Sequence, residues 1–225
     1  MGLNNDNARP VVFDLETAPI DGAEAFLEEP AAPSNYKDPE KIAAYIAGAK
    51  HGLLDTCALD PDLARIVALG FEVAGEVPTV LMPTTEDEER TALQHFWDCV
   101  AEGHLVGFNC LSFDLQVLSR RALYLEVPVP SIALDRYKHP RVTDLLEVLS
   151  FGSIQRRHSL MFYCKRFGIT VPDPLEQGGA EVGKAVREGR LDDVQRHCFA
   201  DVCHTAGLAH RLGVFPVPFV TRTGL

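Results

Sequence analysis

Two acidic residues interrupt an otherwise apolar run near the start of the chain. Residues 10–16 read Pro-Val-Val-Phe-Asp-Leu-Glu, which is typical of a β-strand and puts Asp14 and Glu16 on the same face. Two carboxylates on one face repel each other unless a cation neutralises them, and Mg²⁺ and Mn²⁺ prefer such oxygen ligands. The pair therefore indicates a divalent-metal site, although a strand end whose acids face solvent would show the same pattern.

Two later segments also carry an acid beside an apolar element. Residues 105–114 predict a short strand that ends at Asn109, a turn, and a helix capped by Ser112 with Asp114 in its first turn. Near the C-terminus, His197 and Asp201 are four residues apart and share one helical face. Taken singly, Asp114 could serve only the helix dipole and the second pair could be exposed.

The order of the remaining elements predicts how these residues are brought together. Hydrophobic periodicity and turn residues indicate strands at 10–16, 64–73, 77–82 and 104–109, and helices at about 85–100, 113–125, 144 onward, 159–166 and 191–212. We therefore expect an α/β fold in which a mixed sheet has helices on both faces. Residues 20–62 are expected to form an insertion after the first strand, packed over the sheet.

Length and composition fit a single domain over residues 1–225. Hydrophobic residues make up 46% and charged residues 24% of the 225, an ordinary globular composition. No apolar run is long enough to span a bilayer, and the expected strand at Val11 leaves no room for a signal peptide. The six cysteines lack framework spacing and are expected to be reduced, so we expect a cytoplasmic location.

The net charge of −11 argues against a protein that coats nucleic acid, because such a protein needs a basic face. It does not exclude an enzyme that meets nucleic acid at a metal-filled cleft, where bound cations dominate the local field. Basic residues do cluster, and each cluster could also be a solvated helix face: Arg120-Arg121, Arg136 to Arg141, Arg156-Arg157-His158 and Lys165-Arg166. No one cluster dominates, which favours short single-stranded ends over long duplex tracts as substrate.

The acidic segments, taken in their order, resemble the DEDD superfamily of 3′–5′ exonucleases. The pattern is Asp-x-Glu-Thr, then Asn-x3-Phe-Asp, then His-x3-Asp before an apolar helix. Further segments resemble the DNA-polymerase-B-like proofreading exonucleases of phages and bacteria: 58–67, Gly107-Phe-Asn, Asp144-Leu-Leu and Glu188-Gly-Arg190. This resemblance covers about residues 11–211.

The resemblance implies an RNase H-like fold and a two-metal phosphodiesterase that releases nucleoside 5′-monophosphates from nucleic acid. The four carboxylates of Asp14, Glu16, Asp114 and Asp201 would hold two Mg²⁺ or Mn²⁺ ions, with Asp14 bridging them. His197 would orient or deprotonate the attacking water. Substrate contacts are expected from five residues: Leu15, Thr17, Ala18, Asn109 and Phe113. Replication or repair proteins would be its partners, and no membrane is expected to be one.

The third segment departs from the family pattern at His197. The polymerase-B-like group has Tyr at this position, with three residues between it and the Asp. The histidine branch of the superfamily has one residue more between its His and its Asp. One extra helical residue rotates a side chain by about 100°, so the two arrangements are not interchangeable. Two alternatives therefore stay open: a catalytically inactive nucleic-acid-binding or scaffold protein, and an exoribonuclease. A zinc site formed by His197, Cys198, Cys203 and His204 is disfavoured. All four lie on one helix, and at this spacing their side chains cannot all reach a single tetrahedral ion.

Overall fold

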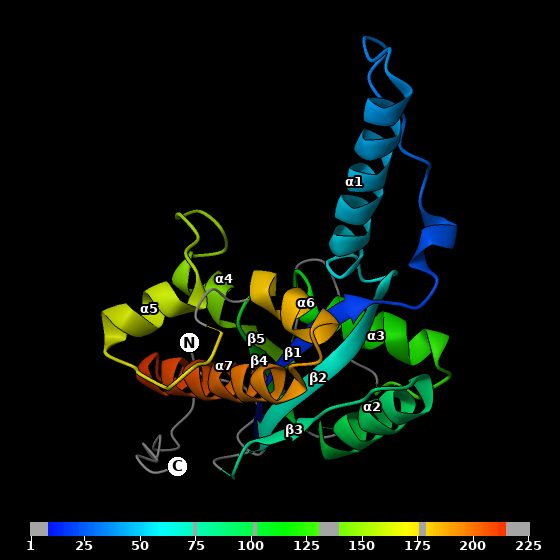
Figure 1. The fold of residues 1–225 in the computed structure, drawn as a ribbon. Helices are drawn as coiled ribbons and strands as arrows, with labels where there is room; N and C mark the ends of the chain where they lie inside the picture. The colour runs from blue at the N-terminus through cyan, green and yellow to red at the C-terminus, as the bar shows by residue number, and fades with distance from the viewer. Residues whose placement is uncertain (1–8, 74–75, 101–102, 131–139, 176–178, 215–225) are drawn as a thin grey trace.

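The computed structural model describes residues 9–73, 76–100, 103–130, 140–175 and 179–214. Five strands form one sheet in the order β3-β2-β1-β4-β5, with antiparallel pairing in the first three strands and parallel pairing of β1 with β4 and of β4 with β5 (Figure 1). The strands are β1 (Pro10–Pro19), β2 (Ala64–Val73), β3 (Thr79–Leu81), β4 (His104–Gly107) and β5 (Val142–Asp144). The helices are η1 (Ala23–Phe26), α1 (Pro39–Cys57), α2 (Glu86–Val100), α3 (Asp114–Tyr124), α4 (Leu145–Leu149), α5 (Leu160–Phe167), α6 (Gly179–Arg187) and α7 (Leu191–Arg211).

Strand β1 lies at the centre of the sheet and is longer than its sequence predicts. It pairs with β2 from Val11↔Val73 to Pro19↔Ala64, with a register shift between Glu16 and Thr17. We expected the strand to end at Glu16, but this bulge lets the pairing resume and carries the strand through Pro19. The bulge therefore lies directly after the two acids of β1.

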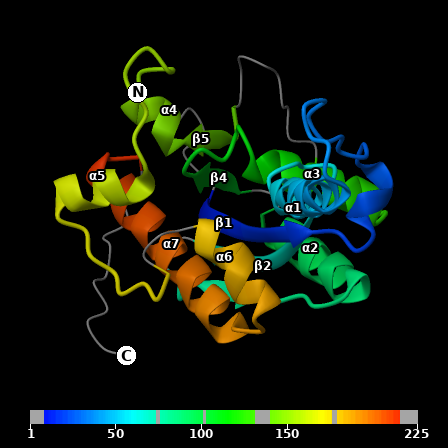
Figure 2. The same ribbon diagram turned by 45° about the horizontal axis from the view of Figure 1, so that its top comes forward.

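The two faces of β1 pack against different helices. Phe13 and Leu15 belong to a core shared with Phe96 of α2 and Leu118 of α3. Val12, which points to the opposite face, packs in a second core with residues of α5 and α7. Figure 2 shows α5, α6 and α7 on one side of the sheet and α2 and α3 on the other. The predicted α/β fold with helices on both faces is confirmed, and strand alternation turns Asp14 and Glu16 toward α7.

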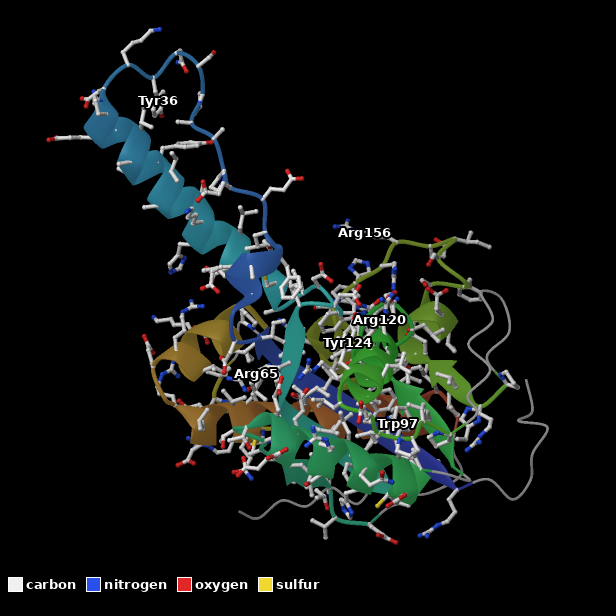
Figure 3. The ribbon with its side chains drawn as sticks, turned by 90° about the vertical axis from the view of Figure 1, so that its right-hand side faces the viewer. Tyr36, Arg65, Trp97, Arg120, Tyr124 and Arg156 are labelled. Carbon is white, nitrogen blue, oxygen red and sulfur yellow. The ribbon has the colours of Figure 1, made fainter. Side chains whose placement is uncertain are left out.

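We expected the insertion to pack over the sheet, but it does not. Its helix α1 projects from the body as an arm (Figure 1), and Cys57 at its base is its one buried residue. The arm carries Tyr36 near its far end (Figure 3), where the ring lies 5.6 Å from that of Tyr45. The apolar residues of α1 are spread around the helix instead of forming one stripe, so no single face of it is suited to pack on the sheet.

Several boundaries differ from the expected ones because tertiary contacts decide them. Ser112 does not cap α3: the N-cap position is Phe113, without a side-chain hydrogen bond. Asp144 caps α4 and Ser159 caps α5, each with a side chain that accepts from backbone N–H groups of the first turn. Strand β5 and helix α6 were not expected at all. In the described part of the chain, no helix has the length and apolar character needed to cross a membrane.

Candidate active site

The first two carboxylates come from the central strand. Asp14 is partly buried and Glu16 is 8% exposed, and both precede the point where the β1–β2 register shifts. The backbone carbonyl of Asp14 accepts a bond from the Cys198 thiol of α7 at 3.8 Å. The face of β1 that carries both acids therefore lies directly under α7.

The third carboxylate depends on a tight turn between β4 and α3. Asn109 occupies the left-handed region with φ 61°, and the backbone N–H groups of Asn109 and Leu111 donate to the buried Asp144 carboxylate at 2.9 and 3.1 Å. The turn delivers Asp114, 8% exposed, to the start of α3, where its carboxylate accepts the backbone N–H of Leu15. Asp144 thus holds the turn rather than the reacting centre.

The fourth carboxylate and the histidine come from α7. A Cβ on Gly70 of β2 would lie 2.7 Å from Val202 and 2.8 Å from the Cys198 sulfur, so only glycine lets α7 approach this closely. At this separation the His197 Nε2 atom lies 3.5 Å from a Glu16 oxygen and 3.8 Å from an Asp201 oxygen. The predicted i, i+4 pair therefore meets β1.

Burial and mutual repulsion raise the pKa values of these acids. The pKa of Asp14 is well above its usual range because of burial, and then because of the charges on Asp201, Glu16 and Asp114. Burial first, and then the charges on Asp201, Asp114 and Asp173, raise the pKa of Glu16 well above its usual range. Burial raises the pKa of Asp114 to about 7, with a further contribution from Asp144. Such a cluster favours protons or metal ions in the site.

Asp173 belongs to the site but was not predicted. Its carboxylate oxygens lie 2.9 Å from Nδ1 of His197, and its side chain is only 6% exposed. The backbone N–H of Leu175 holds the same carboxylate at 2.8 Å. Because a carboxylate only accepts, Nδ1 carries the proton and Nε2 faces Glu16 and Asp201. Asp173 lies between two prolines in an irregular loop, so periodicity gives no signal for it.

His204, one helical turn after Asp201, contacts the Asp201 carboxylate. Its Nδ1 atom lies 3.3 Å from an Asp201 oxygen, and the histidine is fully buried. The zinc set disfavoured from the sequence does not form. In the described part of the chain, the ligand atoms of Glu16, His197 and Asp201 lie within 4.8 Å of one another, close enough to share one ion; Asp14 and Asp114 are not part of this closest group.

The residues expected to touch substrate occupy varied positions. Leu15 and Ala18 are buried in the core, and Phe113 packs partly against it. Thr17 is buried, and its hydroxyl donates to the Ala58 carbonyl at 2.6 Å. The Asn109 side chain lies nearer the surface and accepts a hydrogen bond from Arg157. Their contacts with substrate stay predictions.

The site fits divalent metal ions by its donors. Among the described residues, Asp14, Glu16, Asp114 and Asp201 make no ion pair with Lys or Arg, and His197 and His204 are the basic side chains that contact the cluster. Carboxylate oxygens are the ligands that Mg²⁺ and Mn²⁺ prefer, and a cation removes the repulsion that raises the pKa values.

The fold and this cluster define the class of RNase H-like exonuclease domains. A family model described as a predicted 3′–5′ exonuclease related to the exonuclease domain of PolB matches residues 59–215. The chain belongs to this family, and the resemblance inferred from the acidic segments is confirmed. A search of the curated proteins found no match.

One solved structure shares the fold, and two others are similar to this chain at lower TM-scores. The family B DNA polymerase of the archaeon Pyrobaculum calidifontis superposes with a TM-score of 0.61 at 22% identity, over 91% of this chain and 24% of the polymerase. Product-bound exonuclease I has a TM-score of 0.41 at 15% identity, over 92% of this chain and 48% of exonuclease I. Exonuclease I of E. coli in complex with a dT13 oligonucleotide has a TM-score of 0.41 at 14% identity, over 91% of this chain and 41% of exonuclease I. The chain thus spans about a quarter of the polymerase and less than half of exonuclease I.

Proposed function

We propose that this chain is a two-metal-ion 3′–5′ exonuclease that releases nucleoside 5′-monophosphates from single-stranded DNA ends. The observation that carries the proposal is the cluster of Asp14, Glu16, Asp114 and Asp201, two of them buried and two partly buried, whose charges the described chain leaves without a Lys or Arg partner. A scaffold protein gains nothing from such a cluster, because mutual repulsion destabilises the fold. Membership of a family related to a DNA polymerase domain favours DNA over RNA.

The four carboxylates of Asp14, Glu16, Asp114 and Asp201 would hold the metal ions. Bound there, two divalent cations supply charge stabilisation for the attacking and leaving oxygens of a phosphodiester hydrolysis. The protein contributes a dry and rigid set of ligands, since Glu16 and Asp114 are each 8% exposed. Rigid placement matters because small errors in ligand position are costly in catalysis.

His197 would act as the general base at Nε2. Its Nδ1–H is held by the Asp173 carboxylate, which fixes the ring orientation and leaves Nε2 free to take the proton of the attacking water. The imidazolium that forms would be stabilised by the Asp173 charge 2.9 Å away. This arrangement supplies a base at the spacing where the related exonucleases carry Tyr.

The test is hydrolysis of 5′-labelled single-stranded DNA and RNA oligonucleotides with Mg²⁺, Mn²⁺ or EDTA. We expect stepwise shortening from the 3′ end, faster on DNA, that stops in EDTA. The Asp14→Ala variant should lose the activity, whereas Asp21→Ala, which removes an exposed acid just after β1, should keep it. Intact oligonucleotides under every metal condition would refute the enzyme proposal and leave the inactive scaffold.

A further inference from the structure

The surface beside the candidate active site contains a segment whose charge is opposite to that of the protein as a whole. Residues 148–172 contain four basic side chains and no acidic one, although the chain has 32 acids and a net charge of −11. We call residues 150–168, the loop after α4 together with α5, the basic aromatic segment. Its apolar side chains are also unusually exposed: Phe151 at 73%, Ile154 at 82%, Met161 at 43% and Phe162 at 42%.

The loop of this segment presents Phe151 through a costly but firmly held conformation. Phe151, Gly152 and Ser153 follow one another with φ angles of 52°, 66° and 66°. A bulky residue rarely adopts this region, because it is sterically strained there, and persists in it only where the surroundings enforce it. Here the fully buried Ser150 enforces it, since its hydroxyl donates to the Leu146 carbonyl at 2.6 Å and accepts the Ser153 N–H at 3.1 Å. An exposed aromatic ring is thus held outward at an energetic cost.

Helix α5 continues the same surface with a flat aromatic pair. The rings of His158 and Phe162 stack at 3.9 Å with an interplanar angle of 12°, over the buried Tyr163. Lys165 and Arg166 follow in the last turn of this helix. Stacked rings beside cationic side chains are what nucleic-acid bases and phosphates bind.

In the other basic clusters of the described chain, basic side chains make ion pairs or hydrogen bonds within the protein. Arg120 pairs with Asp62 at 2.6 Å, and Arg121 is buried against Glu89 at 2.7 Å, so it is no solvated helix face. Arg141 donates to the Gly103 carbonyl, and residues 136–139 lie outside the described chain. By contrast, no ion pair in the described chain involves three residues of the segment, namely Arg156, Lys165 and Arg166. Figure 3 shows Arg156 extending outward from its loop.

Arg157 connects the segment to the candidate active site. It donates to the side-chain oxygen of Asn109 and lies 3.9 Å from Glu147. Asn109 begins the turn that places Asp114, so the segment adjoins the wall of the site. In Figure 1 the loop projects on the same side of the body as α1, with α6 between them in this view.

We propose that the basic aromatic segment is a subsite for single-stranded nucleic acid, which holds nucleotides on the 5′ side of the scissile bond. This proposal rests on the proposed exonuclease function. Bases stack on Phe151 and on the His158–Phe162 pair, and the basic side chains bind the phosphates between them. Sequence-independent stacking of this kind suits an enzyme that degrades any sequence.

The decisive variant is Phe151→Gly, because it separates binding from stability. Glycine adopts a positive φ without strain, so the variant should unfold at a higher temperature than the wild type. Its affinity for a 5′-fluorescein dT12 oligonucleotide, measured by anisotropy in EDTA, should nevertheless fall by roughly 5- to 100-fold, the effect of losing one stacked base. The matched control is Phe26→Ala, which removes a 70% exposed ring far along the chain and should bind dT12 like the wild type.

A second pair of measurements tests the charges and isolates the reaction. Arg156→Gln with Arg166→Gln should flatten the salt dependence of dT12 binding by about 0.7 in slope for each lost phosphate contact, while Lys41→Gln on α1 should not. Hydrolysis of the p-nitrophenyl ester of thymidine 5′-monophosphate needs only the scissile bond. Phe151→Gly should therefore lower kcat/KM for dT12 far more than for this ester.

Two outcomes distinguish failure of this proposal from failure of the enzyme proposal. Wild-type affinity for dT12 in the Phe151→Gly and Arg156→Gln/Arg166→Gln variants, with the ester still hydrolysed, would overturn the subsite and leave a protein partner as its occupant. A wild-type protein that hydrolyses neither dT12 nor the ester would instead refute the exonuclease function.

Discussion

Replacing Asp114 with Asn should stabilise the metal-free protein while removing its activity. Burial raises the pKa of Asp114 from the ordinary 3.8 to about 7. Between these values the folded protein holds a proton that the unfolded chain has released, so stability falls as pH rises through this window. At 1.36 kcal/mol per pKa unit, the loss reaches about 4 kcal/mol above pH 7 and less than half of that at pH 5.

The Asn side chain has no such dependence, because it cannot ionise and its oxygen can still accept the Leu15 N–H. In EDTA at pH 8, Asp114→Asn should therefore exceed the wild type by up to about 4 kcal/mol in free energy of unfolding. This corresponds to a rise of roughly 8–16 °C in Tm at 2–4 °C per kcal/mol. At pH 5 the difference should shrink to less than half.

The measurement is urea and thermal unfolding of both proteins in EDTA at pH 5 and pH 8, with Asp21→Asn as the exposed control. Mg²⁺ should then raise the Tm of the wild type more than that of Asp114→Asn, since only the wild type has the full set of ligands. A variant no more stable than the wild type at pH 8, or a gap that is the same at both pH values, would refute the claim that repulsion and burial destabilise this site.

Three further predictions concern the residues that position the site. Asp173→Asn should lower kcat for DNA hydrolysis by roughly 10²- to 10⁴-fold with little change in KM, because the base loses its orienting charge; full activity would exclude this role. Gly70→Ala should lower the free energy of unfolding by about 1–3 kcal/mol, since its Cβ would displace α7, whereas Gly48→Ala on the open α1 should not. Arg121→Met should lower the free energy of unfolding in urea by about 3–5 kcal/mol, because it leaves Glu89 buried and unpaired. The double variant Arg121→Met/Glu89→Leu should regain much of this stability.

The sequence by itself determined the class of fold and the acidic residues of the site. Strand alternation predicted that Asp14 and Glu16 share a face, and helical periodicity put His197 and Asp201 together on another. These are local properties, because the periods of a strand and a helix are written in a few neighbouring residues. The order of the segments then sufficed for the family, which the match over residues 59–215 confirms.

Tertiary structure alone decided which neighbours those residues have. Asp173 reaches His197 from an irregular loop 24 positions away, and no periodicity encodes such a contact. The direction in which α1 leaves the body is likewise a tertiary property, because its apolar residues do not mark one face for the sheet. The sequence thus specified the chemical groups of the candidate site, whereas long-range packing fixed the orientation of the His197 ring, because that orientation depends on contacts between segments that are distant along the chain.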